Sequence, residues 1–123
     1  MKKIFLAFVF ATVLYSCKTT NIATAVSQKN EVQVSINLSE IRNDKVMVIV
    51  NAPTILTDKI TYHLPKTGPG TYSEDNFGNY IEDLKALDAK GNSLEIQKLD
   101  ENSWSIANAK TLDKITYWVN DTY

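Results

Sequence analysis

Segments in which apolar and polar residues alternate recur from residue 32 to the C-terminus. The first of them, VQVSINL at residues 32–38, has an apolar residue at every second position and amides or a serine between them. A period of two is typical of a half-buried β-strand, because successive side chains in a strand point to opposite faces. We therefore expect a strand here with its valine, isoleucine and leucine side chains in a core.

The same reasoning predicts further strands downstream. The segment VMVIV at 46–50 is a short run rich in β-branched residues, which is typical of a strand buried on both faces. The segments that alternate again are KITYHL (59–64), SLEIQKL (93–99), SWSIAN (103–108) and KITYWVND (114–121).

One segment, NYIEDLKALDAKGN at 79–92, fits two structures. Its apolar residues have helical spacing, which favours a helix. The sequence DAKGN, however, is typical of a hairpin turn in which Gly91 adopts a positive φ, and a strand precedes such a turn. We interpret the segment as a strand. The chain then has about seven short strands separated by turns, which predicts an all-β fold, an antiparallel β-sandwich.

The N-terminus has the features of a secretory signal. Two lysines precede an apolar run of eleven residues, 4–14, which is too short for a membrane-spanning helix of about 20 residues. The run ends in LYSC, which resembles a bacterial lipobox, although Tyr15 is larger than the usual residue there. This resemblance implies cleavage before Cys17 and attachment of lipid to its sulfur. A plain secretion signal followed by a chance cysteine is the alternative.

These features divide the chain into three parts. We expect a lipoprotein signal peptide at 1–16, a flexible tether at 17–30 and a folded β-domain at 31–123. The domain would lie in the periplasm or at the cell surface, held to a bacterial membrane by its lipid. Lys18, which follows the cysteine where an aspartate would retain the protein at the inner membrane, favours the outer membrane.

Composition and motifs argue against several classes of function. The net charge of −1 gives no reason to expect nucleic acid as a partner. The chain has one cysteine and one histidine, His63, and it lacks H-E-x-x-H, a P-loop and G-x-S-x-G. The sequence therefore assigns this chain no catalytic residue, no metal ligand and no cofactor.

The loop PKTGPGTYSEDNFGNY at 65–80 carries more aromatic residues than a solvated linker usually does. Pro65 ends the preceding strand, and Pro69-Gly70 favours a tight turn with a positive φ at the glycine. The aromatic side chains then either close the end of the sandwich or line a cleft or interface. The candidate residues for such a site are Pro69, Gly70, Thr71, Tyr72, Phe77 and Tyr80.

Residues 31–123 resemble the N-terminal β-domain of the glycyl aminopeptidase family, zinc metallopeptidases that often carry a PDZ domain. The resemblance rests on the order and spacing of four elements, namely P-G-T-Y (69–72), A-x-D-x-x-G (86–91), N-x-W-x-I (102–106) and I-x-Y-x-V (115–119). It implies a β-sandwich that precedes a thermolysin-like catalytic domain, in which zinc is bound and where H-E-x-x-H would lie. No catalytic residue of that family is carried over to this sequence.

Two functions remain open at this point. In the first, the chain is the non-catalytic N-terminal domain, as a fragment, of a lipid-anchored zinc aminopeptidase, and it packs on the catalytic domain of the same polypeptide and helps to shape the substrate cleft. In the second, it is a stand-alone lipoprotein that binds a peptide or protein partner. Whether the chain takes part in an enzyme is therefore not decided by its own residues.

Overall fold

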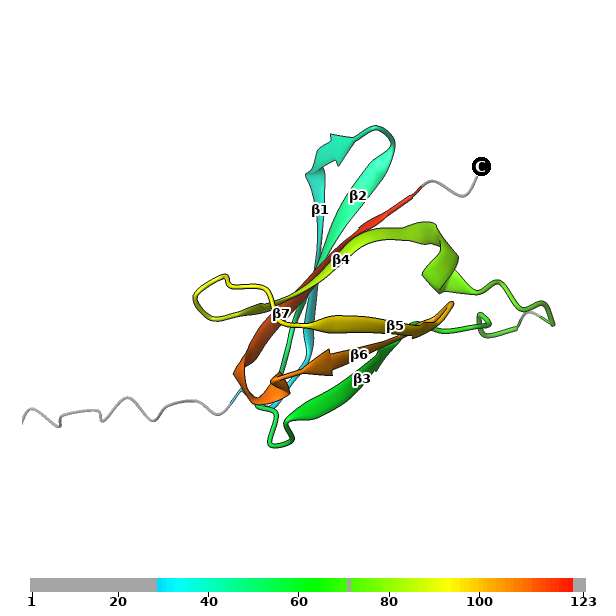
Figure 1. The fold of residues 1–123 in the computed structure, drawn as a ribbon. Helices are drawn as coiled ribbons and strands as arrows, with labels where there is room; N and C mark the ends of the chain where they lie inside the picture. Colours follow the sequence, from blue (N-terminus) through cyan, green and yellow to red (C-terminus); the bar gives the residue numbers. More distant parts are fainter. Residues whose placement is uncertain (1–28, 71, 121–123) are drawn as a thin grey trace, which may run out of the picture.

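The computed structural model describes residues 29–70 and 72–120. The predicted signal peptide, Cys17, most of the predicted tether and Thr71 lie outside the described residues. Within the described part, the chain forms seven strands arranged in two antiparallel sheets (Figure 1). The predicted all-β sandwich is therefore confirmed.

The larger sheet has four strands and the smaller one has three. The strand order of the large sheet is β1 (Gln33–Arg42), β2 (Lys45–Asn51), β7 (Leu112–Val119) and β4 (Ile81–Asp88). The order of the small sheet is β3 (Lys59–His63), β6 (Ser103–Ala107) and β5 (Ile96–Asp100). Two short 3₁₀ helices, η2 (Phe77–Tyr80) and η3 (Ala109–Thr111), precede β4 and β7.

The core lies between the centres of the two sheets. Val48 and Val50 of β2 pair with Tyr117 and Ile115 of β7, and all four side chains are buried on one face of the large sheet. From the small sheet, Ile106 of β6 enters the same core and is fully buried. The alternation of the sequence therefore predicts the inward faces of β6 and β7 correctly. The buried residues of the described ranges form one cluster, so the domain has a hydrophobic core of its own.

The prediction for the second strand needs correction, and one large aromatic residue lies outside the core. In β2 only the face of Val48 and Val50 is buried, whereas Met47 and Ile49 are half-buried, so the prediction of burial on both faces is wrong. Trp118 lies on the outer face, where the Arg42 guanidinium sits 5.8 Å from its ring centre. A sheet with one covered face leaves the alternate side chains outside.

The ambiguous segment 79–92 is a strand for most of its length. It begins in η2, continues as β4 and ends in a turn where Gly91 has a φ of 85°. The Asp88 carboxylate accepts hydrogen bonds from the backbone N–H groups of Lys90 (2.9 Å) and Asn92 (2.8 Å). It also accepts one from the Asn92 side chain, which is the main reason why the pKa of Asp88 is lowered. Local turn chemistry thus outweighed the helical spacing.

The first strand departs most from expectation. β1 forms over Gln33–Arg42, but every residue in it is exposed, so the prediction of a half-buried strand at 32–38 is wrong. Val34 and Ile36 pair with Val50 and Val48 and share their face of the sheet. The small sheet does not cover β1, and Figure 1 shows the turn between β1 and β2 well away from β3, β5 and β6. No helix among the described residues is long and apolar enough to cross a membrane.

Candidate functional site: an apolar pocket at one end of the sandwich

A pocket of about 540 Å³ lies where the loop after β3 folds over the edge of the large sheet. Its walls come from four segments: the end of β3 and the following loop, η2, the start of β4 and the end of β7. The lining residues are Leu64, Pro65, Thr67, Gly68, Pro69, Phe77, Tyr80, Ile81 and Val119.

The loop that forms one wall is closed at its base by backbone hydrogen bonds. The carbonyl oxygen of Lys66 accepts hydrogen bonds from the N–H groups of Asp75 (2.8 Å) and Asn76 (2.9 Å). At the far end of the loop, Gly70 has a φ of 85°, as the Pro69-Gly70 turn predicted. The closure across Lys66 brings η2 back beside the end of β3, and the pocket lies between them.

Asn102, in the turn between β5 and β6, fixes η2 in this position. Its side-chain oxygen accepts a hydrogen bond from the N–H of Gly78 (2.9 Å), and its side-chain nitrogen donates one to Asn76 (2.9 Å). Its backbone oxygen accepts a third from Leu64 (2.8 Å). Asn102 is only 2% exposed. One buried amide therefore ties both sides of the pocket to the small sheet.

The turn that carries Asn102 is itself held by Asp100. The carboxylate accepts hydrogen bonds from the Ser103 hydroxyl (2.7 Å) and from the backbone N–H of Asn102 (2.8 Å). These bonds, the hydroxyl first, hold the pKa of Asp100 below its ordinary value. These hydrogen bonds stabilise the fold at pH values above the pKa that Asp100 has in the unfolded chain. The stabilisation is lost as the pH falls through the lower pKa of the folded state, so the turn that holds Asn102 weakens only in acid.

Gly78 is a glycine because η2 passes very close to the neighbouring turn. A Cβ added at this position would lie 1.9 Å from the carbonyl oxygen of Glu101 and 2.9 Å from the Cα of Asn102. Gly78 is not among the glycines with a positive φ. Glycine is required at this position because no space is left for a side chain, and not because the backbone conformation is unusual.

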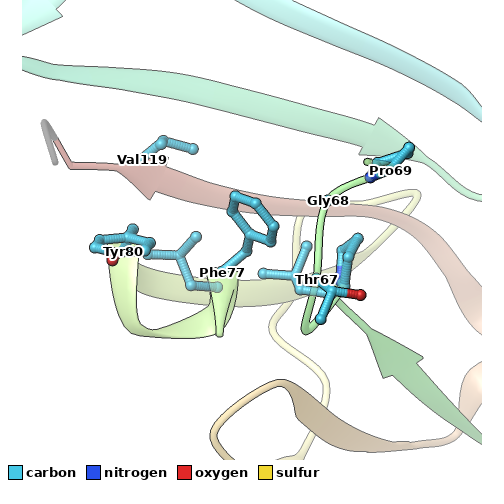
Figure 2. Close-up of a pocket in the computed structure, with 9 residues that line it drawn as sticks. Thr67, Gly68, Pro69, Phe77, Tyr80 and Val119 are labelled. Atoms are coloured by element: carbon cyan, nitrogen blue, oxygen red, sulfur yellow. The ribbon is translucent and has the colours of Figure 1, made fainter. Parts of the chain in front are cut away.

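The candidate residues of the loop have separate locations. Pro69, Phe77 and Tyr80 line the pocket, and Figure 2 shows the Phe77 ring between Tyr80 on one side and Thr67 and Pro69 on the other. Gly70 follows Pro69 at the turn. Tyr72 is fully exposed, at 108%, and it neither lines the pocket nor closes the sandwich.

Six of the nine lining residues were not among the candidates from the sequence, and three of these six lie outside the loop at 65–80. Leu64 follows β3, whereas Ile81 and Val119 pair with each other at the ends of β4 and β7. Leu64, Ile81 and Val119 each belong to a segment that the sequence analysis interpreted as a strand. All three lie at the end of a strand or directly after it. This position could have indicated a site, because the opposite sheet no longer covers the ends of the strands.

The chemistry of the pocket suits an apolar group. Its lining consists of aliphatic and aromatic side chains, proline rings and a threonine. Nearby acids are engaged elsewhere, since Glu82 pairs with Lys45 and Asp83 with Lys85. Within the described ranges no group of three or more histidine, cysteine or acidic residues could hold a metal ion. The pocket can therefore receive an apolar side chain and offers little polar chemistry.

The end of β7 forms part of the pocket wall. Val119 is both the last residue of β7 and a lining residue, and the N–H of the following Asn120 donates a hydrogen bond to the carbonyl oxygen of Tyr80 (2.7 Å). The main chain therefore passes beside the pocket as it leaves the large sheet.

A family model for the peptidase M61 N-terminal domain matches residues 33–123, which include every strand and every lining residue of the pocket. The chain belongs to this family. The resemblance to the N-terminal domain of glycyl aminopeptidase-type peptidases is thereby confirmed, and the matched domain is the non-catalytic part of such a peptidase.

A solved structure shares the fold of this peptidase N-terminal domain. An aminopeptidase N family protein from Idiomarina loihiensis superposes with a TM-score of 0.66 and is 22% identical in sequence. The match covers 76% of this chain and 16% of that chain, so the domain corresponds to a small part of a much longer protein. A search of curated proteins gave no match.

Proposed function

We propose that this peptidase N-terminal domain serves a lipid-anchored zinc metallopeptidase of the glycyl aminopeptidase type, and that its apolar pocket receives a side chain of the catalytic part. The domain would then position the catalytic part and help to shape its substrate cleft. The zinc of such an enzyme would be held by the catalytic part.

The observation that carries this proposal is the composition and place of the pocket. Exposure of an open apolar hollow to water is unfavourable, and its burial by a partner lowers the free energy. Val119 forms its wall at the end of β7, so polypeptide that follows the domain in a longer protein would begin beside it. Because the end of β7 lies at the pocket, the downstream part of the same polypeptide could fill the pocket without a long connection.

The coding region downstream of codon 123 provides a first test. We expect a continuation, in frame or after a frameshift, that encodes H-E-x-x-H within a few hundred codons. DNA sequencing of the locus decides this. A stop codon followed by an unrelated gene would contradict a partner in the same polypeptide and favour a stand-alone lipoprotein that binds another protein.

The lipid anchor is tested separately. We expect cells that express the chain to incorporate labelled palmitate into it, to process it in a globomycin-sensitive step and to retain it in the outer-membrane fraction. Cys17→Ala removes the only cysteine and should abolish the label and the membrane retention. Labelling that persists in Cys17→Ala would rule out this anchor, whatever the fate of the proposed peptidase partner.

A further inference from the structure

An aliphatic row crosses the large sheet near the turn between β1 and β2, at the end that the small sheet leaves uncovered (Figure 1). Each of the four strands contributes one residue, and each residue lies directly opposite the next: Ile81 of β4, Val119 of β7, Val46 of β2 and Ile41 of β1. Opposite residues of paired strands share a face of the sheet, and here it is the face that carries the core. Because neighbouring strands lie about 4.8 Å apart, the row is about 14 Å long.

The aliphatic row is partly buried at β4 and β7 and exposed at β1. Ile81 and Val119 pack against the core, and Val46 is half-buried. Ile41 is 60% exposed, and Ile36, on the same face of β1, is 59% exposed. The uncovered end of the sheet therefore presents neighbouring apolar side chains to solvent, and such a surface is typical of an interface.

The pocket lies at one end of the aliphatic row. Two members of the row, Ile81 and Val119, line the pocket, so a body that fills the pocket lies directly beside Val46. The chain also leaves the domain here. Asn120, which directly follows the row in β7, donates a side-chain hydrogen bond to the Glu82 carboxylate (3.0 Å). Polypeptide that follows Asn120 in a longer protein would therefore start beside the row.

One side chain in the pocket is too small a contact to hold two domains together. Even an aromatic side chain buries only about 150–250 Å². Interfaces between domains of one chain bury about 600–1,500 Å². A catalytic part that is seated in the pocket must therefore contact more of this domain, and the aliphatic row continues the apolar lining of the pocket across the sheet.

We propose that the catalytic part of the same polypeptide covers the aliphatic row as well as the pocket, and that Ile41 and Ile36 of β1 belong to the docking surface. This inference rests on the proposed function and extends its contact from the pocket across all four strands of the large sheet. The occupant is selected by the continuity of the row with the pocket and with the point where the chain leaves the sheet. Pairing of another strand with the edge of β1 would use neither feature.

The test is the affinity of residues 18–123 for the separately purified catalytic part, taken from the downstream reading frame or from another member of the glycyl aminopeptidase family. Isothermal titration calorimetry measures the Kd. Ile41→Asp and Ile36→Asp each place an unpaired carboxylate in an apolar contact, and each should raise the Kd at least about tenfold. Both residues are exposed in the isolated domain, so both variants should unfold in urea at nearly the wild-type concentration.

Two control variants separate the position of the charge from its mere presence. Asn37→Asp introduces the same charge beside Ile36 but on the opposite face of β1. Leu56→Asp replaces another exposed aliphatic residue, which is 80% exposed and lies between β2 and β3. Both variants should bind the catalytic part with the wild-type Kd.

The result for Phe77→Asp in the pocket separates this inference from the proposed function. If Phe77→Asp binds weakly but Ile41→Asp and Ile36→Asp bind like wild type, the aliphatic row is not part of the docking surface and the proposed function stands. If all three bind like wild type, both fail. Unchanged binding of Ile41→Asp together with a loss of self-association in sedimentation velocity would assign the row to a second copy and overturn the inference.

Discussion

Replacing Gly78 with alanine is expected to destabilise the domain by about 3 kcal/mol or more, because the added methyl group has no space. Its Cβ would lie 1.9 Å from a backbone oxygen in the turn before β6, so η2 must move away. That movement breaks the hydrogen bond from the Gly78 N–H to Asn102 and leaves a buried amide without a partner. Urea unfolding of Gly78→Ala and wild type measures the loss.

Two other glycines are suitable controls for this substitution. Gly70 and Gly91 both have a φ of 85°, and a Cβ at either position would have no atom within 4 Å. Alanine at position 70 or 91 should destabilise the domain only through the left-handed backbone conformation, by about 1–2 kcal/mol. Asn102→Ala removes the same hydrogen bond without a steric clash and should cost about 1–3 kcal/mol. If Gly78→Ala were no more destabilising than Gly70→Ala, close approach would not be the reason for this glycine.

The regular part of the fold could be predicted from the sequence because alternating residues mark the strands and the faces that enter the core. Ile106, Ile115 and Tyr117 occupy the inward positions that the period of two assigns to them. The turn at Gly91 depends on short-range hydrogen bonds around Asp88, and these are encoded locally. The inward faces of the strands and the turn at Gly91 both depend on residues that lie close together in the sequence.

The exposure of β1 could not be predicted by the same reasoning. Alternation shows which side chains share a face, but it does not show whether a second sheet covers that face. Val34 and Ile36 have the pattern of a core strand and lie beyond the reach of the small sheet. An apolar row of this kind is ambiguous in sequence, since a core and an interface select the same residues.

The pocket was only partly predicted, because its walls come from segments far apart in the chain. The loop was identified by its prolines, glycines and aromatic residues, but Leu64 and Val119 contribute through tertiary structure alone. Tyr72 and Phe77 looked equivalent in the sequence. The closure of the loop by Lys66, together with the hydrogen bonds of Asn102, places Phe77 in the pocket, whereas Tyr72 is left in solvent.

This difference between the two aromatic residues leads to the second large effect. If the pocket receives a side chain of the catalytic part, Phe77→Asp places an unpaired carboxylate in an apolar contact, which is strongly unfavourable. Phe77 is 38% exposed in the isolated domain, so the domain itself should tolerate the change better than the complex does. Tyr72→Asp introduces the same charge on the same loop at a fully exposed position and serves as the matched control.

The most direct test of the pocket as the docking site is the affinity between residues 18–123 and the separately purified catalytic part. The catalytic part comes from the downstream reading frame or, in its absence, from another member of the glycyl aminopeptidase family, and binding is followed by isothermal titration calorimetry. We predict that Phe77→Asp raises the Kd at least about tenfold, or about 1.4 kcal/mol, whereas Tyr72→Asp leaves it nearly unchanged. Equal affinity of Phe77→Asp and wild type, with both folded, would contradict the proposal that this pocket holds the catalytic part.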